Sequence, residues 1–233
     1  MSLDDPLFWT ALLKIIGVNI VLSGDNAVVI ALASRSLPAR QQRLAIQWGA
    51  GAAIVLRIVL TLFAVALLAL PWLKLLGSAL LLWIGVKLLV PDGGEGDVDA
   101  SDSLYGAIRT ILIADIVMSL DNVIAVAAAA GGHWLLLSLG LAISIPLVIF
   151  GATLLVKVME RFPFVITVGA ALIGFVAGEM AWDDQAIRAW TDFHPPLAKY
   201  LSAGLGAAFV VGVGQWLGRR AQSRHAAAAG SAR

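Results

Sequence analysis

The chain has 233 residues, of which 60% are hydrophobic and only 13% are charged. A soluble domain would carry about 25% charged residues, so this composition excludes an ordinary soluble protein and indicates one membrane-embedded domain. The net charge of +1 gives no electrostatic reason to expect a nucleic-acid partner, and the absence of cysteine excludes disulfides and thiolate metal sites.

Seven apolar stretches are long enough to cross a bilayer, which requires roughly 20 helical residues. Lipid permits only helices or closed barrels, and the chain shows no alternating strand pattern. We therefore predict an all-α, polytopic membrane protein whose single transmembrane domain covers residues 1–217. The predicted helices cover residues 7–33, 44–70, 72–90, 104–130, 134–157, 163–181 and 198–217.

Polar segments separate or follow these helices. Residues 91–103 form an acidic, glycine-rich linker, residues 182–196 a polar loop, and residues 218–233 a basic, alanine-rich tail that we expect to be disordered. Arginine and lysine in short loops mark the cytoplasmic side, and they follow the first, fifth and seventh predicted helices. This distribution predicts an N-terminus outside the cell, with the linker and the C-terminal tail in the cytoplasm.

The first and fourth predicted helices contain nearly the same polar phrase. The first copy reads VNIVLSGDNAVVIALAS over residues 18–34, and the second reads ADIVMSLDNVIAVAAAA over residues 114–130. A unit of three helices ends on the side of the membrane opposite to its start, so the second unit enters from the other side. Residues 7–90 and 104–181 are thus predicted to form an inverted 3+3 repeat, with residues 198–217 as an extra helix.

Each copy of the phrase places polar side chains on one side of its helix. Residues at positions i, i+4 and i+7 share a helix face, and the aspartate of each Asp-Asn pair lies beside that face. Ionisable side chains are costly in lipid, so we predict a functional role rather than a structural one. The predicted site consists of Asn19, Ser23, Asp25, Asn26, Asp115, Ser119, Asp121 and Asn122.

The two helices are predicted to bring together three carboxylates, those of Asp25, Asp115 and Asp121, and carboxylates that converge in an apolar space require cations or protons. Ligation by oxygen alone suits Mg²⁺, Ca²⁺ or Mn²⁺, and the three histidines all lie in predicted loops or in the tail. The sequence therefore predicts a divalent metal as transported substrate, with proton exchange as a physically available partner reaction. Arg57, in the middle of the second helix, either neutralises an aspartate, contributes to a gate, or forms a fixed structural ion pair.

The paired segments SGDNAVVIALA and SLDNVIAVAAAA resemble the TerC family of bacterial integral membrane proteins, most closely its short YjbE-type branch. The family was named for tellurium resistance, and its members are associated with manganese export. The resemblance implies an inner-membrane secondary transporter that exports Mn²⁺, with Asp25-Asn26 and Asp121-Asn122 as metal-binding motifs. The second repeat has Asp115 where the first has Asn19, so the two halves of the site are expected to differ.

Two other functions stay open at this point. An intramembrane aspartyl protease would use two aspartates that share one proton, although the Gly-x-Gly-Asp signature is absent. A scaffold for stress-response partners would need no transport, although the linker and tail are small. The favoured interpretation is a non-enzymatic transporter without a resident cofactor. Its expected partners are the divalent metal ion, the lipid bilayer and further copies of the chain in a homo-oligomer.

Overall fold

The computed structural model of the chain describes residues 9–10, 12–17, 24–68, 70–90, 100–130, 134–190 and 195–231. Within these ranges all regular structure is helical and no strand occurs, which confirms the all-α prediction. The helices are α2 (Gly24–Ser34), α3 (Ala39–Leu68), α4 (Leu73–Leu89), α5 (Ala100–Ala130), α6 (Trp134–Arg161), α7 (Phe164–Trp182), α8 (Gln185–Trp190) and α9 (Pro196–Ser231).

Four stretches of these helices are long and apolar enough to cross a bilayer. They are Ala39–Thr61, Ser138–Arg161, Phe164–Trp182 and Leu197–Ala221, and each corresponds to one of the seven predicted spans. At most 39% of the residues in any of these four windows are buried inside the bundle, which leaves apolar faces available to lipid. The other three predicted spans, 7–33, 72–90 and 104–130, stay predictions.

Two polar segments differ from their predicted structure. The tail prediction is wrong over residues 218–231, because α9 continues as a helix to Ser231. Alanine is the strongest helix former, and extending an existing helix avoids the cost of nucleation, so an Ala-rich tail continues α9. The predicted loop 182–196 likewise contains the short helix α8.

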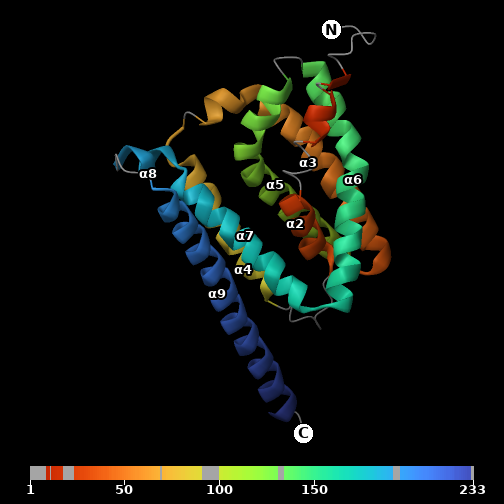
Figure 1. Cartoon of the computed structure of the whole chain (residues 1–233). Coiled ribbons are helices and arrows are strands. Elements are labelled where there is room, and N and C mark those ends of the chain that lie inside the picture. Colours follow the sequence, from red (N-terminus) through yellow and green to blue (C-terminus); the bar gives the residue numbers. More distant parts are fainter. Residues whose placement is uncertain are drawn as a thin grey trace.

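The helices pack in matched pairs. Helices α2, α3 and α4 contact α5, α6 and α7 respectively, and the crossed contacts α2–α6 and α3–α5 are both present. Helix α7 also lies against α4 and α9, and Figure 1 shows α9 extending past the rest of the bundle towards the C-terminus. Thus α2 and α5, which carry the repeated phrases, meet inside the bundle with α3 and α6 around them.

Helices α7 and α9 approach closely through small residues. A Cβ atom at Gly174 would overlap the carbonyl oxygen of Gly206, and one at Gly178 would overlap that of Ser202. The hydroxyl of Ser202 donates a hydrogen bond of 2.8 Å to the carbonyl oxygen of Gly178. Close backbone approach of this kind is how helices associate in lipid, where burial of apolar surface gives little driving force.

Candidate functional site

A buried ion pair joins α3 to α5. Arg57 Nη2 donates to Asp115 Oδ1 at 2.6 Å, and Arg57 Nε donates to Ser119 Oγ at 2.9 Å. Ser119, one turn after Asp115, donates its hydroxyl to Asp115 Oδ2 at 3.2 Å. The side chains of Arg57 and Asp115 are only 3% and 7% exposed. Both carboxylate oxygens of Asp115 are therefore engaged in a closed ring of three side chains.

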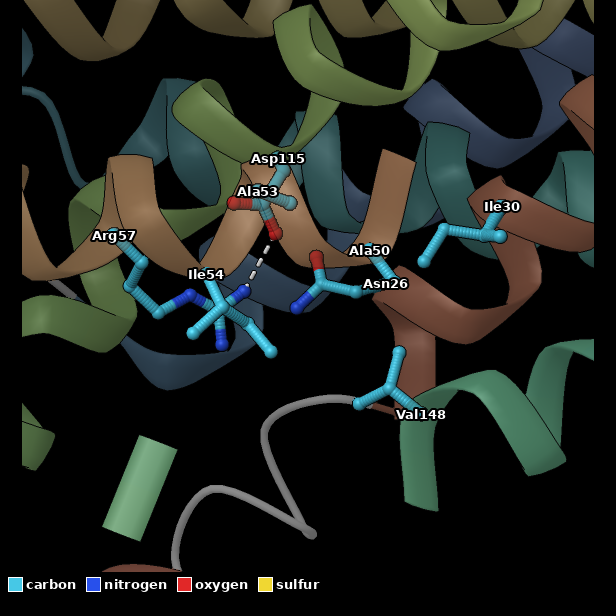
Figure 2. A pocket seen from close by; sticks show the side chains of 8 residues that line it. All are labelled: Asn26, Ile30, Ala50, Ala53, Ile54, Arg57, Asp115 and Val148. Atoms are coloured by element: carbon cyan, nitrogen blue, oxygen red, sulfur yellow. Dashed lines mark hydrogen bonds and ion pairs between the residues drawn. The ribbon is translucent and has the colours of Figure 1, made fainter. Parts of the chain in front are cut away.

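A small cavity lies beside this ring, at the meeting point of four helices. Its volume is about 10 Å³, which is the space of about one water molecule. Figure 2 shows the Asp115 carboxylate between the Arg57 side chain and the Asn26 amide, with apolar side chains around them. The apolar walls strengthen any charge interaction inside. The lining residues are Asn26, Ile30, Ala50, Ala53, Ile54, Arg57, Asp115 and Val148.

Asp25 adds a second carboxylate at this site. It lies in the first turn of α2, is half-buried, and accepts a 2.8 Å hydrogen bond at Oδ1 from the backbone N–H of Asn26. Asp25 lies within electrostatic reach of both Arg57 and Asp115. With both carboxylates ionised, the described part of the site has two negative charges and the one positive charge of Arg57. It can therefore accept a further cation.

The structure brings together five of the residues singled out in the sequence. Asp25 and Asn26 of α2 lie near Asp115, Ser119 and Arg57, and Arg57 is the charge partner of Asp115. This contact fits two of the roles predicted for Arg57, neutralisation of an aspartate and a fixed structural ion pair.

Other predicted site residues are placed less fully. Asn122 is buried on α5 with 9% exposure. Asn19, Ser23 and the side chain of Asp121 lie outside the described residues. Among the side chains that the structure describes, no three acidic or histidine residues cluster closely enough to hold a metal ion. The predicted convergence of three carboxylates therefore stays a prediction that depends on Asp121.

Asp184 is a structurally important carboxylate that the sequence analysis missed. It is fully buried and accepts hydrogen bonds from the backbone N–H groups of Trp72, Leu75 and Ala186, at 3.1, 3.1 and 2.7 Å. Burial opposes its ionisation, but these backbone hydrogen bonds outweigh that effect and lower the pKa of Asp184. Asp184 precedes α8 directly, which is the position of a helix N-cap. This signal could have predicted α8, but not the bond to the start of α4.

Next to Asp184 lies a cluster of more exposed charges. Asp183 pairs with Lys199 at 2.7 Å and with Arg188 at 2.8 Å, and Lys199 also lies 3.9 Å from Glu179. Partial burial disfavours the charged form of Asp183, but the hydrogen bonds and charges of Lys199 and Arg188 outweigh this and lower its pKa. These residues connect the end of α7 with α8 and the start of α9. We call Glu179, Asp183, Asp184, Arg188 and Lys199 the terminal cluster.

Helices of spanning length and a buried ion pair between them, in the part of the chain that the structure describes, are features of a helical integral membrane protein. Residues 4–222 match the family described as the integral membrane protein TerC family, and the chain belongs to that family. No solved structure matches the chain. The family resemblance expected from the repeated Asp-Asn phrase is thereby confirmed.

Curated relatives are named as membrane proteins. The chain is 42% identical over 201 residues to the "Uncharacterized membrane protein YjbE" of Bacillus subtilis, a match that covers 86% of this chain and 92% of the relative. It is 29% identical to the "UPF0053 inner membrane protein YgdQ" of Escherichia coli, over 73% of this chain and 83% of the relative. These names agree with a membrane location and assign no substrate.

Proposed function

We propose that this protein is a secondary transporter that exports a divalent cation, preferentially Mn²⁺, from the cytoplasm. The observation that carries the proposal is the charge balance of the buried site: two carboxylates, Asp25 and Asp115, lie near one buried arginine. A pair of Arg57 and Asp115 alone would serve as a structural contact. When it is ionised, Asp25 leaves an excess of negative charge, which is costly in an apolar bundle and favours binding of a further cation.

The donor atoms favour a hard divalent ion. Asp25, Asp115, Asn26 and Ser119 offer carboxylate, amide and hydroxyl oxygens, which suit Mg²⁺, Ca²⁺ and Mn²⁺. The preference for Mn²⁺ rests on the family resemblance, since oxygen ligation does not distinguish these ions. Asp121 and Asn122 of the second phrase, and Asn19 and Ser23 of the first, would complete the ligand shell.

We also infer that residues 7–90 and 104–181 form an inverted repeat. The helix contacts support this repeat. A two-fold axis that exchanges α2, α3 and α4 with α5, α6 and α7 would turn the α2–α6 contact into the α5–α3 contact, and both contacts are present. Gly77 of α4 and Gly169 of α7 occupy matching positions in the two units, and each lies against a valine of the other unit. Gly77 contacts Val117 of α5, and Gly169 contacts Val28 of α2. Each contact joins one unit to the phrase-bearing helix of the other, an arrangement suited to rocking around a central site.

A predicted orientation follows from the same arrangement. Arg35, after α2, donates a 2.7 Å hydrogen bond from Nη1 to the carbonyl oxygen of Leu88 near the end of α4. Both helix ends would face the cytoplasm if the N-terminus lies outside. The C-terminus, one span after α7, would then also be cytoplasmic.

The protease alternative is less well supported by the site. An aspartyl dyad needs two carboxyl groups that share one proton. Both oxygens of Asp115 are already engaged, Oδ1 by the guanidinium of Arg57 at 2.6 Å and Oδ2 by the hydroxyl of Ser119 at 3.2 Å, so neither is placed to share a proton with a second carboxyl group. A scaffold function would leave the buried charges without a role.

Measurement of intracellular manganese tests the export proposal. In manganese-sensitive cells, the wild-type protein is expected to lower cellular Mn, whereas Asp25→Asn and Asp115→Asn lose this effect because each removes a ligand charge. Glu160→Gln, at an exposed position, is the control and should behave as wild type. Unchanged cellular Mn with the wild-type protein would contradict export, and full activity of both aspartate variants would contradict the site.

A further inference from the structure

Building on the proposed cation transport, we propose that Arg57 is a tethered cation: it occupies Asp115 when the site is empty and leaves when a divalent ion enters. It would thereby allow the empty transporter to change its access state. The proposal rests on the contacts of Asp115, on the size of the adjoining cavity and on the charge count at the site.

The contacts of Asp115 place Arg57 in direct competition with a metal. A divalent ion binds a carboxylate oxygen at about 2.0–2.6 Å. Arg57 Nη2 already lies 2.6 Å from Asp115 Oδ1, and Ser119 Oγ lies 3.2 Å from Oδ2. An ion at either oxygen would be adjacent to the guanidinium, and two cations at such a distance repel strongly in an apolar environment.

The cavity is too small for both cations. Its volume of about 10 Å³ accommodates about one water molecule, and Arg57 and Asp115 both form part of its wall. Entry of a metal with several oxygen ligands therefore requires displacement of the guanidinium. Arg57 belongs to α3 and Asp115 to α5, so either rotation of the arginine side chain or a shift between these helices would separate them.

The charge count indicates what this exchange achieves. With Arg57 on Asp115 and with Asp25 ionised, the empty site carries a net charge of about −1; after the guanidinium has left and a divalent ion has entered, the loaded site carries about 0. Without Arg57, the empty site would carry about −2 and the loaded site about 0. A change of access state is costly when the empty site has two uncompensated negative charges in an apolar bundle. A variant without Arg57 should therefore change its access state, outward or inward, only while a metal ion is bound.

Transport assays on the full chain in proteoliposomes separate two modes. Net flux is the entry of Mn²⁺ into metal-free vesicles, and exchange is the entry of labelled Mn²⁺ against unlabelled internal Mn²⁺. The wild-type protein should perform both. Arg57→Gln should lose about tenfold or more of net flux and keep exchange within about twofold, whereas Arg57→Lys, which restores a positive charge, should keep net flux. Arg43→Gln, at an exposed position on the same helix, is the matched control.

Each outcome bears on the proposal. Loss of both modes in Arg57→Gln, or retention of both, would overturn it.

Equilibrium Mn²⁺ binding to the purified protein gives an independent test: Arg57→Gln should bind about tenfold more tightly, since a competing cation is removed, and weaker binding would also overturn the proposal. If the wild-type protein moves no Mn²⁺ in either mode, the proposed function itself fails. If the wild type transports while Arg57→Gln gives an overturning result, only the role of Arg57 fails.

Discussion

The buried site and the terminal cluster both contain paired charges, but their surroundings give those charges different roles. In the terminal cluster, Asp184 is saturated by backbone N–H groups, and Asp183 has two cationic partners of which Arg188 is 58% exposed. These contacts hold α4, α8 and α9 to the end of α7. In the buried site, two carboxylates share one arginine among apolar side chains. The comparison teaches that carboxylates whose oxygens are held by backbone N–H groups or by directly paired cations serve structure, whereas the two buried carboxylates, which have one arginine between them, are suited to receive an ion.

The largest expected effect concerns the buried pair. Replacement of Arg57 by Leu leaves the Asp115 carboxylate without this partner in an apolar bundle, and should destabilise the protein by about 3–5 kcal/mol. The double variant Arg57→Leu/Asp115→Leu should recover most of this loss, because no charge of the pair is then buried. Thermal unfolding of the purified protein in detergent measures both. A double variant no more stable than Arg57→Leu would show that the pair is not the source of the effect.

A smaller loss is expected from Asp184→Ala in the terminal cluster. This change removes the acceptor of three backbone N–H groups at the starts of α4 and α8, and replacement of a helix N-cap by alanine costs about 0.5–2 kcal/mol. The melting temperature should fall while Mn²⁺ transport at lower temperature is kept. A selective loss of transport in a stably folded Asp184→Ala protein would contradict the division between the two regions.

The acid dependence of stability should come partly from the terminal cluster. The folded-state pKa values of Asp183 and Asp184 are lowered from the ordinary value of 3.8, so their stabilising effect is present above that pH. It is lost as the pH falls from 3.8 through the lower folded-state pKa values. The variant Asp184→Asn should therefore lose less stability than wild type between pH 5 and pH 3, on the order of 1 kcal/mol for each unit of pKa shift. An identical pH profile for the two proteins would contradict this assignment.

The smallest effect is expected at the exposed edge of the terminal cluster. Arg188→Gln removes one cationic partner of Asp183 while Lys199 remains at 2.7 Å. Exposed ion pairs contribute little, so the free energy of unfolding should change by less than about 1 kcal/mol, and less in high salt. A larger change, unaffected by salt, would show that this region is more tightly coupled to the bundle than its exposure indicates.

Much of the fold was predictable because its signals are local. Apolar stretches of spanning length predicted the long helices, and the i, i+4 spacing predicted that Asp115 and Ser119 share a face, which their hydrogen bond confirms. The Ala-rich tail was misjudged because its composition suggested disorder while its helix propensity and its continuity with α9 favour a helix. Local composition alone thus did not decide how far α9 extends.

The missed features depend on contacts between distant segments. The sequence predicted Asp115 as a metal ligand and Arg57 as a possible partner of an aspartate, but it did not indicate that these two residues form a contact across 58 residues. Asp184 reaches Trp72 across 112 residues, and no pattern near either residue indicates this bond. The helix packing determines such pairs, so the sequence predicted which residues matter more readily than which partner each one has.

Mn²⁺ binding to the purified protein tests the central claim most directly. Free Mn²⁺ gives an electron paramagnetic resonance signal that is lost on binding, so a titration reports affinity without requiring transport. The account predicts saturable binding by the wild type and by Asp183→Asn of the terminal cluster, and binding weakened about tenfold or more by Asp25→Asn, because a ligand charge is removed. Equal binding by wild type and Asp25→Asn, or equal weakening by Asp183→Asn, would contradict a cation site at Asp25 and Asp115.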